Sequence, residues 1–253
     1  MDDLSLLIEL HSGGERQGPG GVEQTHLAID LSGLRNGRDL KIADIGCGTG
    51  ASTLVLAQTL NAQIVAIDFL SPFLRLLEQR AQTAQLSDRI TTLACSMDAL
   101  TMPPHSLDAI WSEGAIYNMG FEQGVRQWAR LIKPGGVLAV SELTWLTERR
   151  PAELEAHWQA EYPEVDTASA KIAILEKNGF SVQGYFVLPP CCWLDNYYAP
   201  MRQRFPEFLQ THVGTHQHAA AQAIVAAEER EIALYERYHG FFGYGFYIAR
   251  KTV

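Results

Sequence analysis

Cysteines and long apolar runs are scarce in this sequence. Only four of its 253 residues are cysteine: Cys47, Cys95, Cys191 and Cys192. Cys47 lies in a glycine-rich stretch and Cys95 follows an apolar run, so the cysteines do not form a disulfide framework and favour a reducing cytoplasm. No apolar stretch approaches the ~20 residues that span a bilayer, and the apolar run near the start is too short for a signal peptide. We therefore expect no membrane segment.

Positive charge is also in short supply. The chain has 20 Lys and Arg against 29 Asp and Glu, a formal charge of −9. This balance disfavours DNA or RNA as a partner, because nucleic-acid binding usually needs a basic face. The length and the apolar content of 47% suit one packed domain, residues 1–253. They leave the oligomeric state open, a homodimer included.

The most informative stretch is KIADIGCGTG, residues 41–50. An apolar run reaches Asp44, and Gly46, Gly48 and Gly50 follow at alternate positions. Residues 51–60 then carry apolar side chains at helical spacing. This order predicts a strand, a tight turn and a helix. Glycine permits a positive φ in such a turn, and it lets a ligand approach the bare backbone at the helix N-terminus.

A second acidic residue points to a ligand with a ribose. Asp68 ends the next apolar strand, QIVAID, where a carboxylate can accept hydrogen bonds from a ribose diol. The other roles for Asp68, a helix cap or a solvated strand end, fit less well because the glycines and the acid fall in βαβ register. The spacing GxGxG differs from the GxGxxG of dinucleotide folds, which disfavours a nicotinamide dehydrogenase.

Strands and helices alternate along the chain. The predicted strands cover residues 40–45, 63–68, 90–94, 107–114, 137–143, 180–189 and 243–251. The predicted helices cover residues 4–10, 22–34, 51–60, 121–131, 167–178 and 219–239, with one more beginning at residue 71. A sharp turn is expected at 133–136 and an aromatic-rich cap loop at 191–208. The alternation predicts an α/β fold with a mainly parallel sheet, helices on both faces and a ligand at the carboxyl edge of the strands.

DIGCGTG, residues 44–50, resembles the first motif of class I S-adenosylmethionine-dependent methyltransferases, whose usual form is E/DxGxGxG. The resemblance covers residues 40–143, because further motifs follow in the family's order. It implies a Rossmann-like doubly wound sheet of seven strands with the last strand antiparallel. It also implies S-adenosylmethionine as cofactor and S-adenosylhomocysteine as product. Residues 1–39 would form an N-terminal helical segment, 40–143 the cofactor-binding core, and 144–253 the substrate-binding cap and final strands.

The resemblance also implies which residues bind the cofactor. Those of the glycine turn would face its amino acid end: Asp44, Gly46, Cys47, Gly48, Thr49 and Gly50. Asp68 would hold the ribose hydroxyls, and Phe69 would pack on the adenine. After the third strand come Ser96 and Met97, the latter in apolar contact with the cofactor. Asp98 either accepts from the adenine amino group or caps the turn that follows it.

Two further segments complete the implied site. The fourth strand ends in Glu113 and Gly114, which resembles the motif that passes beside the reactive methyl group. Glu113 could accept from the cofactor's ammonium group or orient a substrate, and a structural role at a strand end is the alternative. In related methyltransferases an N-terminal segment often closes over the ligands. Arg16 could then meet a carboxylate and Gln17 could donate to one, unless Arg16 is a solvated surface charge.

No general base stands out. The catalytic candidates are Glu113, Tyr117 and His157, together with His11, Tyr197 and Tyr198. A hydroxyl acceptor needs a base, whereas an amine, a thiolate or a stabilised carbanion can react once it arrives deprotonated. The missing base is therefore no argument against catalysis.

The segment after the fourth strand indicates the class of methyl acceptor. Residues 112–115, SEGA, replace the Asn/Asp-Pro-Pro-Tyr/Phe of enzymes that methylate nucleic-acid or glutamine nitrogens, which favours a small-molecule acceptor. A tRNA or protein methyltransferase is one alternative, and a cofactor-binding sensor or partner subunit without turnover is another. We predict no metal site. Cys191 and Cys192 fit two small semi-buried residues, and the remaining cluster fits a polar loop: His212, His216 and His218.

Overall fold

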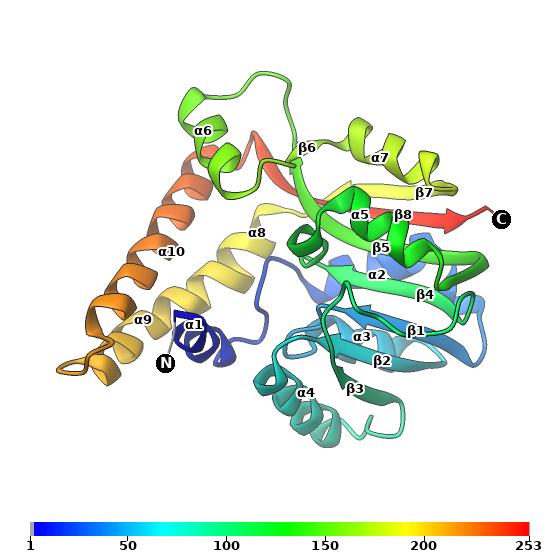
Figure 1. Cartoon of the computed structure of the whole chain (residues 1–253), viewed down its shortest axis with the longest axis horizontal. Coiled ribbons are helices and arrows are strands. Elements are labelled where there is room, and N and C mark those ends of the chain that lie inside the picture. The colour runs from blue at the N-terminus through cyan, green and yellow to red at the C-terminus, as the bar shows by residue number, and fades with distance from the viewer. Residues whose placement is uncertain (1–2, 253) are drawn as a thin grey trace.

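The computed structural model describes residues 3–252, so Met1, Asp2 and Val253 of the predicted domain lie outside the described residues. Its centre is a mixed sheet in the order β3-β2-β1-β4-β5-β8-β7 (Figure 1). The strands are β1 (Leu40–Ile45), β2 (Ala62–Asp68), β3 (Ile90–Ala94), β4 (Leu107–Glu113), β5 (Ile132–Trp145), β6 (Asp166–Thr167), β7 (Phe180–Val187) and β8 (Phe242–Lys251). β1 to β5 run parallel, and β8 lies antiparallel between β5 and β7. The predicted Rossmann-like fold is confirmed, with the two-residue β6 added beside β5.

Helices cover both faces of the sheet. The helices of the described chain are α1 (Asp3–Ser12), α2 (Val22–Ser32), η1 (Leu34–Asn36), α3 (Ala51–Thr59), α4 (Ser71–Thr83), η2 (Ile116–Met119), α5 (Phe121–Ala129), α6 (Ala152–Glu161), α7 (Ala168–Lys177), α8 (Pro190–Trp193), η3 (Leu194–Tyr198), α9 (Ala199–His212) and α10 (His218–Tyr238). Successive strand residues point to opposite faces. In β1, Ile42 therefore joins the apolar cluster under α2 and α3, and Ala43 joins the cluster under α5 and α7. Among residues 3–252 no helix is long and apolar enough to cross a membrane.

A group of helices stands apart from these two layers. α1, α9 and α10 pack on one another, and α1 also reaches α4 (Figure 1). Residues of α1 and α10 face the residues that follow β2, β3 and β4. These helices therefore cover the carboxyl edge of the parallel strands, where the sequence predicts the ligand.

The predicted loop over residues 191–208 is wrong, because this segment is helical. It forms α8, the π-helix η3 and most of α9. Its buried residues recur at helical spacing: Tyr198, Met201, Phe205 and Phe208. Pro190 and Pro200 lie in first turns, where a helix needs no proline N–H. The density of aromatic residues and prolines concealed this period.

Two smaller differences lie near β5. The turn predicted at residues 133–136 is a bulge inside the strand, because pairing with β4 passes from Leu107–Ile132 directly to Ala109–Val137. The stretch 144–166, for which the sequence predicts no element, contains α6 and ends at β6. Neither difference changes the edge of the sheet at which the site lies.

Candidate functional site

The glycine turn between β1 and α3 adopts a conformation that suits glycine. Gly46, Gly48 and Gly50 have φ values of 72°, 55° and 87°, which L-residues with side chains rarely adopt. A Cβ added to Gly46 would lie 2.3 Å from the Cβ of Ala115. At Gly48 it would lie 2.4 Å from Gln17 Oε1. The turn therefore needs glycine both for its path and for the close approach of its neighbours.

Two carboxylates hold this turn in place. Asp68 Oδ2 accepts from Gly48 N at 2.9 Å and Oδ1 accepts from Leu70 N at 2.8 Å, which ties the end of β2 to the turn. Burial raises the pKa of Asp68 above its ordinary value. Asp44 lies fully buried behind the turn and accepts from Ser52 Oγ at 3.0 Å and Thr53 Oγ1 at 2.6 Å. Burial raises the pKa of Asp44 to about 7.

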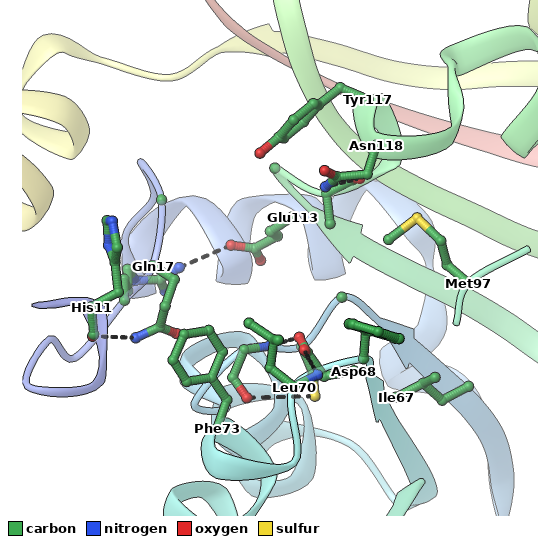
Figure 2. A pocket seen from close by; sticks show the side chains of 18 of the residues that line it. His11, Gln17, Ile67, Asp68, Leu70, Phe73, Met97, Glu113, Tyr117 and Asn118 are labelled. Atoms are coloured by element: carbon green, nitrogen blue, oxygen red, sulfur yellow. Dashed lines mark hydrogen bonds and ion pairs between the residues drawn. The ribbon is translucent and has the colours of Figure 1, made fainter. Parts of the chain in front are cut away.

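A cavity of about 740 Å³ opens beside the turn (Figure 2). Most of the residues predicted to bind the cofactor line it: Arg16, Gln17, Gly46, Cys47, Gly48, Asp68, Phe69, Ser96, Met97, Asp98, Glu113 and Gly114. Three of the predicted residues are not part of its lining: Asp44, Thr49 and Gly50. Asp44 bonds to Ser52 of α3, Thr49 bonds to Gln17 of the N-terminal segment, and Gly50 is the N-cap residue of α3.

Arg16 and Glu113 form a buried ion pair at the wall of the cavity. Arg16 Nη1 lies 3.0 Å from Glu113 Oε2, with side-chain exposures of 11% and 8%. Glu113 Oε1 also accepts from Trp111 Nε1 at 2.9 Å and from Thr25 Oγ1 at 2.7 Å. The second guanidinium nitrogen of Arg16, Nη2, is buried and has no hydrogen-bond partner within the described chain. Glu113 is thus held by three donors, whereas Arg16 keeps unused capacity for an anion.

The N-terminal segment is fastened across the glycine turn. Gln17 Oε1 accepts from Thr49 N at 2.8 Å, and Gln17 Nε2 donates to the His11 carbonyl at 3.2 Å. Arg80 of α4 donates from Nη2 to the Gly14 carbonyl at 3.0 Å and from Nη1 to Thr49 Oγ1 at 2.6 Å. Arg80 was not predicted, because its partners lie more than 30 residues away and no local motif marks it.

The residues after β3 line the side of the cavity that carries Phe69. Ser96 Oγ donates to Asp98 Oδ1 at 2.5 Å, and Trp128 Nε1 donates to the Met97 carbonyl at 3.1 Å. Ala99 N donates to the Ser96 carbonyl at 3.1 Å, so a turn does follow β3. Phe69 is 68% exposed and can move against a planar ligand.

The other end of the cavity is made by segments far apart in the chain. Its residues come from α1, η2, η3 and α10: Leu4, Leu7, Ile8, His11, Tyr117, Asn118, Met119, Tyr197, Glu228 and Glu231. Figure 2 shows Tyr117 and Asn118 on the opposite side of the space from Asp68 and Leu70. Neither glutamate was predicted, because an acidic pair on a long helix indicates a solvated face. Tyr117, a catalytic candidate, is placed here.

The remaining candidates lie outside the cavity lining. His157 lies on α6 with its ring edge-on to Trp158, the centroids 4.9 Å apart, and burial lowers its pKa. His212 Nε2 contacts Glu9 Oε1 at 3.2 Å. Among residues 3–252 no group of three His, Cys, Asp or Glu side chains is arranged to hold a metal ion. Cys191 is exposed and Cys192 is buried.

Comparison with known proteins identifies relatives of the core. Residues 42–136 match the family model described as a methyltransferase domain. The chain is 28% identical over 142 residues to the methyltransferase GfsG of Streptomyces halstedii, covering 56% of this chain and 48% of that protein. It is 30% identical over 117 residues to the 27-O-demethylrifamycin SV methyltransferase of Amycolatopsis mediterranei, and this match covers 46% of this chain and 42% of that protein. The match thus covers less than half the length of each relative.

Solved structures extend the likeness to the whole fold. An S-adenosylmethionine-dependent methyltransferase of Geobacter sulfurreducens in complex with S-adenosylhomocysteine superposes with a TM-score of 0.83. The superposition covers 97% of each chain, at 17% sequence identity. Residues 42–136 are therefore similar to a methyltransferase domain, and the whole chain shares the Rossmann-like fold of the Geobacter protein.

Proposed function

We propose that this protein transfers a methyl group from S-adenosylmethionine to a small molecule. The observation that carries the proposal is the cavity of about 740 Å³ that the glycine turn, Asp68 and Arg16 all face. Ligand sites commonly occupy ~300–1,000 Å³, so this cavity has room for the cofactor and a small acceptor together. A sensor that only binds S-adenosylmethionine would not need the space for an acceptor.

The residues present fit this cofactor. Gly46 and Gly48 line the cavity, where their backbone would face the methionine portion, and the unpartnered Nη2 of Arg16 suits its carboxylate. Asp68 is placed to accept from the ribose hydroxyls while it holds Gly48 and Leu70. The adenine would pack near Phe69, Met97 and Asp98, which all line the cavity, and the Asp98 carboxylate is the proposed acceptor for its amino group.

The protein's part in the reaction is alignment and exclusion of water. Bound S-adenosylmethionine supplies a methyl group already activated on a sulfonium. Holding two reactants in line and dry can contribute much of the rate enhancement. Gln17 and Arg80 keep the N-terminal segment closed over the cavity, and the Glu113 carboxylate stays fixed by Arg16, Thr25 and Trp111. Three predicted catalytic candidates, His11, Tyr117 and Tyr197, line the part of the cavity formed by α1, η2, η3 and α10, which we take as the acceptor end. His157 does not enter this mechanism.

The proposal includes a small-molecule acceptor and a cytoplasmic location. A relative is named for a small molecule, 27-O-demethylrifamycin SV, and the formal charge of −9 disfavours nucleic acid. The cytoplasmic location is supported by four cysteines that form no disulfide in the described chain.

Transfer of label tests the proposal. The protein is incubated with S-adenosylmethionine that carries a tritiated methyl group and with the small-molecule fraction of a cell extract. We expect label in small molecules and an equal yield of S-adenosylhomocysteine, both reduced in Asp68→Ala. Label confined to the tRNA or protein fraction would contradict the acceptor class. Binding of S-adenosylmethionine without transfer to any fraction would favour a sensor or partner subunit.

A further inference from the structure

The acceptor end of the cavity carries more negative than positive charge. Glu228 and Glu231 lie one turn apart on α10, on the same side of the helix, and both line the cavity. His11 Nε2 lies 3.4 Å from Glu228 Oε1. The other basic residue of the described lining is Arg16, which is paired with Glu113. Among the described lining residues of this end, His11 is therefore the one basic side chain beside two carboxylates; Arg204, which interacts electrostatically with Tyr197, is not part of the lining.

Glu231 is partly withdrawn from water. Its Oε1 accepts from the Tyr198 hydroxyl at 2.8 Å. Burial raises the pKa of Glu231 to about 6, which leaves most of the carboxyl ionised at neutral pH. A buried carboxylate that is hydrogen-bonded only to neutral groups is costly, and a cation beside it recovers that cost.

Two aromatic rings complete the same wall. Tyr117 and Tyr197 line the cavity, and no residue of the described chain hydrogen-bonds the Tyr197 hydroxyl. Burial raises the pKa of Tyr197 well above its ordinary value, so the phenol stays neutral. The faces of such rings attract cations, most strongly where water is excluded. Two neutral aromatic rings beside two carboxylates form a site that favours binding of an ammonium group.

We propose that the small molecule bound at this end carries a positively charged amine, held between the carboxylates of Glu228 and Glu231 and the rings of Tyr117 and Tyr197. The inference rests on the proposed function, because it gives this part of the cavity to the methyl acceptor. If the two carboxylates instead served the ammonium group of the cofactor, cofactor affinity would depend on them. The experiment therefore measures both affinities.

Three probes with one ring and different charges test the inference. Tyramine, its alcohol tyrosol and 4-hydroxyphenylacetate are titrated calorimetrically into protein saturated with S-adenosylhomocysteine. We expect tyramine to bind about tenfold more tightly than tyrosol, and 4-hydroxyphenylacetate to bind most weakly. In Glu228→Gln/Glu231→Gln the preference for tyramine should fall to about twofold or less, while S-adenosylhomocysteine affinity stays within about twofold. Glutamine keeps an acceptor for Tyr198, which favours a folded variant.

The same helix supplies a matched control. Glu229→Gln/Glu236→Gln removes the same charge from exposed carboxylates that pair with Arg202, and it should keep the preference for tyramine. Equal binding of the three probes, no binding by any of them, or an unchanged preference in Glu228→Gln/Glu231→Gln would overturn the inference. A large loss of S-adenosylhomocysteine affinity in that variant would overturn it too. Wild-type protein that binds no S-adenosylhomocysteine would contradict the proposed function instead, and the probes would then be titrated into the protein alone.

Discussion

The two ends of the cavity are built in different ways. The cofactor end comes from consecutive βαβ units, and backbone groups form much of it, as where Gly48 N donates to Asp68. The acceptor end is formed by side chains from α1, η2, η3 and α10, among them His11, Tyr117, Tyr197 and Glu231. A site formed by backbone groups requires particular residues, such as glycine, close together in the sequence. A site made by side chains from distant helices leaves no local motif, and it can change its ligand without changing the fold.

Gly46→Ala should give the largest effect and confine it to the cofactor end. The new Cβ would lie 2.3 Å from the Ala115 Cβ at a φ of 72°. Steric overlap and left-handed strain together cost this conformation of the turn roughly 4 kcal/mol. We expect the turn to relieve that cost by shifting, which misplaces the backbone that faces the cofactor and lowers S-adenosylmethionine affinity by about 100-fold or more. Gly135→Ala is the control, since its φ is 76° with no atom within 4 Å of the added Cβ. Equal cofactor affinity in Gly46→Ala and Gly135→Ala would show that the glycine turn does not contribute to cofactor binding.

Asp44 predicts a pH dependence of stability. Its folded pKa of about 7 lies above the ordinary 3.8, so the folded state binds a proton that the unfolded chain releases. Its contribution to stability is full below about pH 4 and is lost as pH rises to about 7, up to ~4 kcal/mol. Asp44→Asn removes this dependence. Urea unfolding measures the difference in stability between Asp44→Asn and wild type. This difference should rise in favour of the variant between pH 4 and 7 and stay level above pH 7. A difference that is constant with pH would contradict the raised pKa of Asp44.

Asp68→Ala should weaken S-adenosylmethionine by ~1–3 kcal/mol, through the lost hydrogen bonds to the ribose. Isothermal titration measures the loss. If the two ends of the cavity are independent, the preference for tyramine over tyrosol stays unchanged in this variant. Unchanged cofactor affinity would remove Asp68 from the binding site and leave it only its bonds to Gly48 and Leu70.

Arg80→Gln should give the smallest effect, on the closure of the N-terminal segment. The change removes bonds to Gly14 and Thr49, and a hydrogen bond contributes ~1 kcal/mol net. We expect a several-fold loss of cofactor affinity and faster proteolysis of residues 3–17. Arg202→Gln, which removes only exposed ion pairs with Glu229 and Glu236, is the control. If the two variants behave alike, Arg80 does not fasten the segment.

The difference between the two ends also explains what could be predicted from the sequence. The fold and the place of the glycine turn followed from local order, because Gly46, Gly48 and Asp68 lie within one βαβ unit. Glu228 and Glu231 gave no signal, since only the packing of α1, α9 and α10 turns them toward the cavity. His157 was a candidate by residue type alone, and the path of α6 places it beside Trp158.

The N-terminal segment lies between these cases. Arg16 and Gln17 were predicted to face a ligand because related proteins close such a segment over the site. The structure adds their partners, Glu113 and Thr49, which are 97 and 32 residues away. Contacts over such distances depend on the finished fold, so the sequence indicated the residues but not the bonds.

Binding of S-adenosylmethionine by the wild-type protein is the first test of whether the glycine turn serves this cofactor. Purified protein, shown to be folded by circular dichroism, is titrated with S-adenosylmethionine and separately with NADH. We expect saturable binding of S-adenosylmethionine that S-adenosylhomocysteine displaces, and no binding of NADH. If the folded protein does not bind S-adenosylmethionine at millimolar concentration, the proposed role of the glycine turn is contradicted. Binding of NADH instead would show that the glycine turn binds a dinucleotide.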